Sequence, residues 1–127
     1  CRVTSDMRIA VWLDDLRDPT SGYFREVVRL YAPQADSVVW VKTYHEFQDA
    51  VTNTVSDPEK ELTALFFDND LGDTEEGLEG RHAFTWFEML VHESGLPRVV
   101  LHAQTANPAA KRELTSGFAA LERHWSS

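Results

Sequence analysis

The stretch LTALFFDND (residues 62–70) runs from an apolar segment directly into two carboxylates, Asp68 and Asp70. Between residues 62 and 67 the apolar side chains do not alternate cleanly with polar ones, as they would in a strand with one face in water. The pattern is typical of a strand covered on both faces, as in a parallel sheet. Both aspartates are therefore expected at the carboxyl end of a buried strand.

Three more segments of this kind occur along the chain, and a segment with helical spacing follows each of the four. The other predicted strands are residues 8–13, 38–42 and 98–103. The apolar stripes of the predicted helices lie within residues 24–31, 44–55, 84–91 and 114–125. The alternation βαβαβαβα predicts an α/β fold with right-handed crossovers and helices on both faces of the sheet. We expect a three-layer sandwich, receiver-like, with a four-stranded parallel sheet in the order 2-1-3-4.

Residues that begin or end helices support these boundaries. Thr43 and Glu46 form a capping-box pattern at the start of the second helix. Gly95 is expected to cap the third helix at its C-terminus. Asn107 is followed by Pro108, a typical N-cap and first helical position, at the start of the fourth. The tryptophans are predicted to fill the core; they are Trp12, Trp40, Trp86 and Trp125.

Length and composition limit the classes of protein to which this chain can belong. A chain of 127 residues with 43% hydrophobic residues fits one folded domain. We predict a single domain over residues 7–127 and interpret residues 1–6 as a tag remnant or an upstream extension. The formal net charge of −9 and the lack of a basic run argue against a general nucleic-acid-binding surface. A single cysteine, and no apolar run near the roughly 20 residues that span a bilayer, predict a cytoplasmic protein without membrane contact.

Carboxylates follow two strands that the predicted order makes neighbours. Asp14 and Asp15 follow the first strand, and Asp68 and Asp70 follow the third. Ligands of open parallel sheets bind beyond the carboxyl ends of the strands, so the four side chains are expected to line one cleft. Oxygen ligands suit Mg²⁺, Mn²⁺ or Ca²⁺, and we predict a divalent cation, Mg²⁺ or Mn²⁺, at these residues. The alternative is that the same carboxylates only cap turns and a helix.

Further polar residues near the strand ends are candidates for binding or catalysis. His102 ends the fourth strand and is predicted to act as acid, base or ligand, or equally to be a buried histidine bonded to backbone. Thr105 and Asn107 are candidate phosphate donors, although an N-cap role explains Asn107 fully. Arg17 is a candidate phosphate clamp or a partner of a surface acid. The acidic segment 74–79 is interpreted as a solvated loop or as a flap ordered by ligand.

The chain resembles a receiver-like family described as cyclic-phosphate-processing receiver domains. The matching stretches are VWLDDLRDP (11–19), VKTYHEF (41–47), FFDNDLGDTEEG (66–77) and TANPAAKREL (105–114). The resemblance implies a truncated receiver fold with an acidic, metal-type pocket. It also implies a role on nucleotide or RNA ends that bear phosphates or cyclic phosphates.

Two departures from the family pattern affect the expected chemistry. Asn69 and Gln104 stand where the family has histidines. An amide can hydrogen-bond a phosphate but cannot transfer protons as imidazole can. General acid–base catalysis would then need His102 or His82 in place of the family histidines. Asp68 and His102 are the candidate catalytic residues.

Three functions are compatible with these residues. The first is metal-dependent processing of a phosphate or cyclic-phosphate end, with a small phosphorylated ligand or nucleotide end as the partner. The alternative is a non-catalytic binding or regulatory module with the same pocket. The third is a phospho-acceptor receiver with Asp68 as acceptor, which is weakened because the predicted sheet lacks the fifth strand that supplies the receiver lysine.

Overall fold

The computed structural model of the chain describes residues 7–71 and 77–126. Strands and helices alternate in the order β1 (Met7–Leu13), α1 (Gly22–Tyr31), β2 (Ser37–Val41), α2 (Tyr44–Ser56), β3 (Lys60–Phe67), α3 (Gly80–Ser94), β4 (Val100–Ala103) and α4 (Pro108–Ser126). All strand pairs are parallel and the sheet order is β2-β1-β3-β4. The predicted receiver-like α/β fold is confirmed. Residues 1–6, and the part of the predicted flap up to residue 76, lie outside the described residues.

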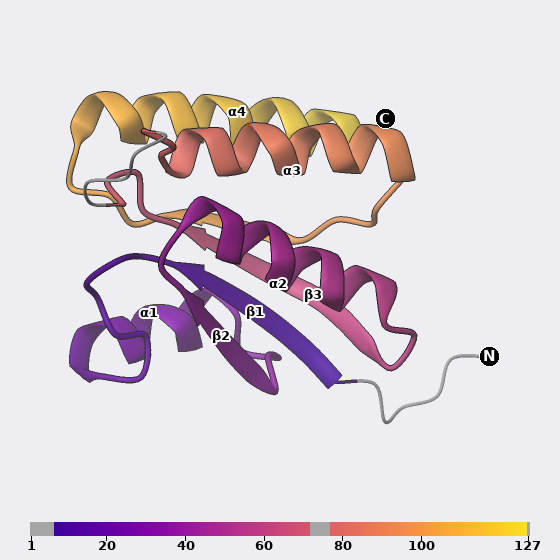
Figure 1. Cartoon of the computed structure of the whole chain (residues 1–127), viewed down its shortest axis with the longest axis horizontal. Helices are drawn as coiled ribbons and strands as arrows, with labels where there is room; N and C mark the ends of the chain where they lie inside the picture. The colour runs from indigo at the N-terminus through magenta and orange to yellow at the C-terminus, as the bar shows by residue number, and fades with distance from the viewer. Residues whose placement is uncertain (1–6, 72–76, 127) are drawn as a thin grey trace.

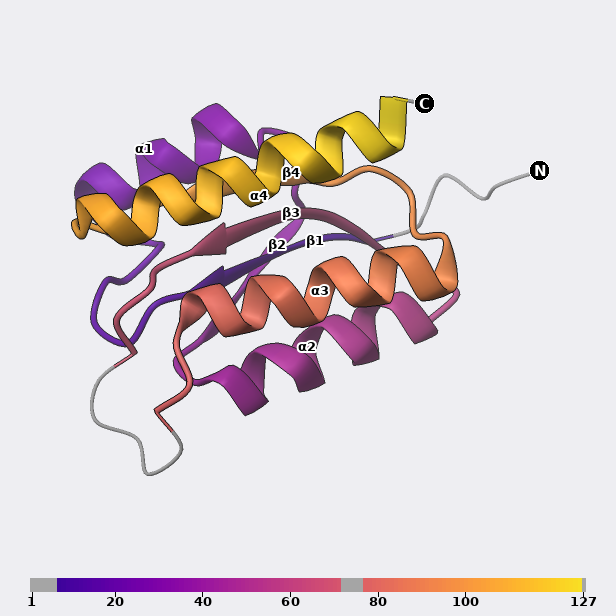
Figure 2. The ribbon, with the colours of Figure 1, turned by 90° about the horizontal axis from the view of Figure 1, so that it is seen from above.

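The sheet separates two unequal helical layers (Figures 1 and 2). Helix α1 covers one face, and α2 and α3 cover the other. Helix α4 packs beside α3 and against β4, so it covers the edge of the sheet on that side. Burying an edge strand under a helix prevents its free backbone groups from pairing with another chain. Within the part of the chain that the structure describes, no helix is long and apolar enough to span a membrane.

The central strands β1 and β3 are buried on both faces, which explains their unbroken apolar sequences. Trp12 and Phe66 point toward α1 and form a small core with Val28. Their neighbours Leu13 and Phe67 point the other way, into the larger core under α2, α3 and α4. Because successive side chains of a strand alternate between faces, each central strand contributes to both cores.

The predicted caps form with one difference. Thr43 Oγ1 accepts the Glu46 N–H at 3.1 Å, but Glu46 Oε1 accepts the N–H of Lys42, at 2.8 Å, one residue before the N-cap. Gly95 ends α3 in the left-handed region with φ 64°, as predicted. The N–H groups of Ala109 and Ala110 donate to Asn107 Oδ1 at 3.1 and 3.2 Å, which makes Asn107 the N-cap of α4.

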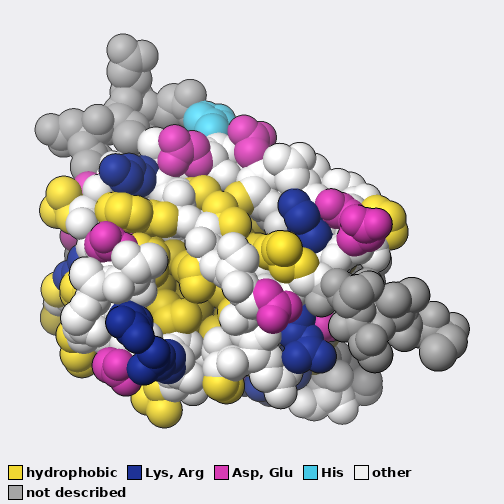
Figure 3. Space-filling model, turned by 90° about the horizontal axis from the view of Figure 1, so that it is seen from below, with side chains coloured by type: hydrophobic (Ala, Val, Ile, Leu, Met, Phe, Trp, Pro, Cys, Tyr) yellow, Lys and Arg dark blue, Asp and Glu magenta, His cyan; other side chains and the backbone are white. Residues whose placement is uncertain are grey.

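Two sequence predictions differ from the structure at the sheet edges. Strand β4 is shorter than predicted and begins at Val100, because the pairing with β3 starts only where Ala64 meets Val100. Trp40 was expected in the core but lies on the edge strand β2 and is 36% exposed. Its indole N–H donates to the Asp14 carbonyl at 2.7 Å, which holds the ring against the turn after β1. Figure 3 shows the molecule from below relative to Figure 1, the side on which β2 and α1 lie. Hydrophobic side chains gather there in a hollow of the surface.

Candidate functional site

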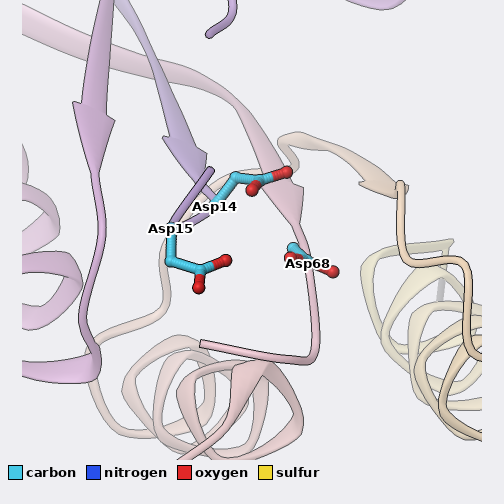
Figure 4. A group of neighbouring side chains, drawn as sticks. All are labelled: Asp14, Asp15 and Asp68. Atoms are coloured by element: carbon cyan, nitrogen blue, oxygen red, sulfur yellow. The ribbon is translucent and has the colours of Figure 1, made fainter. Parts of the chain in front are cut away.

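Three carboxylates meet where β1 and β3 end. Asp14 and Asp15 follow β1 and Asp68 follows β3, and one oxygen of each lies within 4.8 Å of the others (Figure 4). Among the described residues this is the one group of three or more His, Cys, Asp or Glu side chains so arranged. The group borders a cavity of about 270 Å³ lined by Asp14, Asp15, Leu16, Arg17, Asp68, Asp70 and Ala106. The exposed Asp70 thus lines the same cavity but lies outside the three-carboxylate group.

Asp14 is the most firmly held of the three. Its side chain is fully buried. Its Oδ1 accepts the N–H groups of Leu16 and Arg17, each at 2.9 Å. Its Oδ2 accepts the side-chain amide of Gln104 at 3.1 Å. These bonds replace lost hydration and fix the carboxylate in one orientation.

Among the described residues that line the cavity, Arg17 is the only arginine or lysine. Its Nη1 lies 3.6 Å from Asp14 Oδ2 and 3.8 Å from Asp68 Oδ1. The same nitrogen donates to the Gln104 carbonyl at 2.7 Å, and the guanidinium lies 5.8 Å from the centre of the Phe24 ring. Arg17 therefore serves as an internal counter-cation for the acidic group, with a fixed position and one partly exposed side.

Burial raises the pKa of Asp68 from 3.8 to about 6. The Asp14 carboxylate adds to this rise in pKa, since two negative charges in one site repel each other. Arg17 and the Asn69 N–H act in the opposite direction and favour the ionised form. The carboxylate of Asp68 is therefore mostly ionised at neutral pH, at a cost in free energy that an added cation would offset.

Asn69 fastens the end of β3 to the start of α3. Its side-chain amide donates to Glu79 Oε2 at 3.0 Å, and its Oδ1 accepts the Arg81 N–H at 3.2 Å. The Gly80 N–H also donates to the Asn69 carbonyl, at 3.0 Å. A side chain at Gly80 would overlap the Asp68 carbonyl, so only glycine permits this close approach. The interpretation of residues 74–79 as a loop or flap did not include this contact.

The residues after β4 are held mainly by local bonds. Thr105 is buried, and its Oγ1 accepts the Asn107 N–H at 3.1 Å, while Asn107 caps α4. Ala106, between them, lines the cavity, so the start of α4 borders the acidic group. Gln104 anchors Asp14, and its Oε1 is buried without a hydrogen-bond partner. The phosphate-binding roles of Thr105, Asn107 and Arg17 stay predictions.

His102 packs between aromatic side chains. Its ring stacks on Tyr31 of α1, with centroids 4.1 Å apart, and it meets the edge of Phe66 at 5.7 Å. Burial, and secondarily the charge of Lys111, lowers the pKa of His102 below 6.5. His102 is not among the residues that line the cavity. His82 instead accepts the Glu79 N–H on Nδ1 at 2.8 Å, at the start of α3.

A family model described as the cyclic-phosphate processing receiver domain matches residues 9–120. No curated protein and no solved structure matches the chain.

Proposed function

The chain belongs to the family of cyclic-phosphate processing receiver domains, and from this membership we propose that it processes phosphate or cyclic-phosphate ends of nucleotides in a metal-dependent reaction at the strand-end site. The observation that carries the proposal is the meeting of Asp14, Asp15 and Asp68 at neighbouring strand ends.

The donor set fits a hard divalent cation. Three carboxylate oxygens within 4.8 Å of one another can approach one ion of the size of Mg²⁺ or Mn²⁺. We assign Asp15 and Asp68 as ligands, with Asp14 as a third and Asp70 as a further candidate at the rim of the cavity. Such a cation, when bound, would polarise a phosphate oxygen and make a bound water more acidic.

The chain also offers groups for the phosphate itself. Arg17 is positively charged and partly exposed beside the carboxylates, at 3.8 Å from Asp68. Charge-assisted bonds from a guanidinium to phosphate oxygens are strong and directional. The start of α4 borders the cavity through Ala106, and the partial positive charge at the N-terminus of a helix favours anions. The negative charge of a phosphate would thus be balanced by Arg17 as well as by the cation.

In the proposed reaction, water attacks the phosphorus of a cyclic phosphate and one ester P–O bond breaks. The proton lost by the water goes to a base, and a proton is delivered to the leaving oxygen, giving a phosphomonoester. Asp68 is the candidate base, because one of its carboxylate oxygens can bind the cation while the other accepts the proton. His102 is the other candidate from the sequence, but to act it would have to leave its stack on Tyr31.

A non-catalytic binding module is the second candidate function, and two amides favour it. Asn69 and Gln104 stand at the family's histidine positions, and both are engaged in holding the site together. Neither can exchange a proton near neutral pH. A module of this kind would bind the same cation and phosphate without turnover. A phospho-acceptor role for Asp68 is the remaining candidate.

The test compares metal binding with turnover in the same protein. Mg²⁺ and Mn²⁺ are titrated calorimetrically into the wild type, Asp68→Asn and the control Asp49→Asn, an exposed aspartate on α2. Hydrolysis of 2′,3′-cyclic AMP is followed with the same variants. Binding and turnover that are lost in Asp68→Asn and kept in Asp49→Asn support the enzyme. Binding without turnover supports the module, and no divalent binding to the wild type contradicts both.

A further inference from the structure

The C-terminal turns of α3 and α4 lie at the same end of the molecule. Both helices run in the same direction, so their C-termini point the same way (Figures 1 and 2). His92 lies in the last turn of α3 and His124 in the last turn of α4. Their rings are in contact, with centroids 4.3 Å apart and an interplanar angle of 60°. Two exposed imidazoles from different helices therefore share one small region of the surface.

Contacting imidazoles are the ligand type that borderline transition metals prefer. Zn²⁺, Cu²⁺ and Ni²⁺ bind imidazole nitrogen at about 2.0–2.1 Å, so two ring nitrogens on one ion are close neighbours. The contact between His92 and His124, with ring centroids 4.3 Å apart, brings the two imidazoles close enough for both to approach one ion. Exposure of both residues leaves room for an ion and its waters.

The position of the pair also favours a cation. The C-terminus of an α-helix carries partial negative charge from its unpaired carbonyl groups. Two helix C-termini end at this side of the molecule, and both last turns carry basic residues, which is the arrangement that such charge favours. An ion at the pair would experience the partial charge of both helices.

We propose that His92 and His124 form a second metal site, selective for Zn²⁺, Cu²⁺ or Ni²⁺, with water in the remaining coordination positions. The site is separate from the strand-end carboxylates, and its nitrogen ligands distinguish it from an oxygen site for Mg²⁺. A bound ion bridges α3 and α4 and ties the ends of the two helices together. Binding to the folded state alone stabilises that state by mass action.

The experiment uses Zn²⁺ as the probe in a background that lacks the strand-end site. In the Asp68→Asn protein, Zn²⁺ is titrated calorimetrically, and thermal unfolding is measured with and without it. His92→Ala and His124→Ala are compared with the matched control His45→Ala, an exposed histidine on α2. Each of the two pair variants is expected to weaken Zn²⁺ binding about tenfold or more and to remove the rise in Tm, since a two-ligand chelate becomes a single ligand. His45→Ala is expected to change neither.

Equal Zn²⁺ affinity in both pair variants and the parent would overturn the proposal. An NMR measurement on the wild-type protein gives a second test whose result does not depend on how well the variants fold. Ni²⁺ added in small amounts to the wild type is expected to broaden the NMR signals of the His92 and His124 rings first. Broadening that spares these two rings contradicts the site. Loss of Mg²⁺ binding at the strand ends would leave both results unchanged, so the two sites are tested independently.

Discussion

Asp68 is a buried carboxyl group whose ionised form is unfavourable in the folded protein. Its pKa is raised from 3.8 to about 6 by burial and by Asp14. The folded state therefore holds this proton more tightly than the unfolded state does. By linkage, the stabilising contribution of the protonated group is complete below pH 3.8 and is lost as the pH rises through about 6.

Substitution of Asp68 by Asn should therefore stabilise the metal-free protein at pH 8 but not at pH 4. The expected gain at pH 8 is of the order of 3 kcal/mol, because the pKa rises from 3.8 to about 6 and each pKa unit corresponds to about 1.4 kcal/mol. Urea unfolding in EDTA at both pH values measures it, with Asp49→Asn as the control. A variant less stable than the wild type at pH 8 would show that the carboxylate is stabilising there, which contradicts this assignment.

Arg17 occupies a place where it both neutralises the acidic group and competes with other cations. Its Nη1 lies within 3.8 Å of Asp14 and Asp68. Arg17→Gln should bind Mn²⁺ more tightly, because a positive charge beside the ligands is removed, while phosphate binding in the presence of Mn²⁺ becomes weaker. Changes of about tenfold in opposite directions correspond to about 1.4 kcal/mol each. Calorimetric titration of both ions measures them, and a parallel change in the two affinities would contradict the dual role.

At the scale of the element, the junction between β3 and α3 positions the site. Gly80 lies so close to the Asp68 carbonyl that a Cβ has no room. Gly80→Ala should therefore displace the end of β3, destabilise the protein by a few kcal/mol and weaken Mn²⁺ binding at the same time. Gly95→Ala is the matched control, since its φ of 64° costs stability without any nearby contact. Thermal unfolding and Mn²⁺ titration compare the two, and an unchanged Mn²⁺ affinity in Gly80→Ala would contradict the role of the junction.

The elements themselves could be predicted because their patterns are local. Strand segments without alternation identified the parallel sheet, and Thr43, Gly95 and Asn107 marked helix ends through backbone chemistry that depends on few neighbours. The true start of β4 depends instead on where β3 offers partners, which is a tertiary property. The roles of Asn69 and Gln104 were not predictable for the same reason. Asn69 bonds residues ten or more positions away, and Gln104 reaches Asp14 across 90 positions.

At the scale of the whole molecule, strand order decides which side chains meet. The order β2-β1-β3-β4 places the ends of β1 and β3 side by side, so the convergence of Asp14, Asp15 and Asp68 follows from topology. The face that His102 occupies follows from register, since it pairs with Phe66 and therefore points toward α1. A shift of one residue would turn it to the other face. Sequence pattern gives the strand but not this register, so a pocket could be predicted more firmly than a reaction.

A crystal structure of the protein soaked with Mn²⁺ and phosphate would locate any bound metal at the strand ends from the anomalous signal of manganese. We expect a manganese peak bound by oxygens of Asp15 and Asp68, with Asp14 close by and a phosphate oxygen within reach of Arg17. Crystals that show no manganese at these carboxylates would contradict the proposal that this strand-end group is a metal-dependent phosphate site.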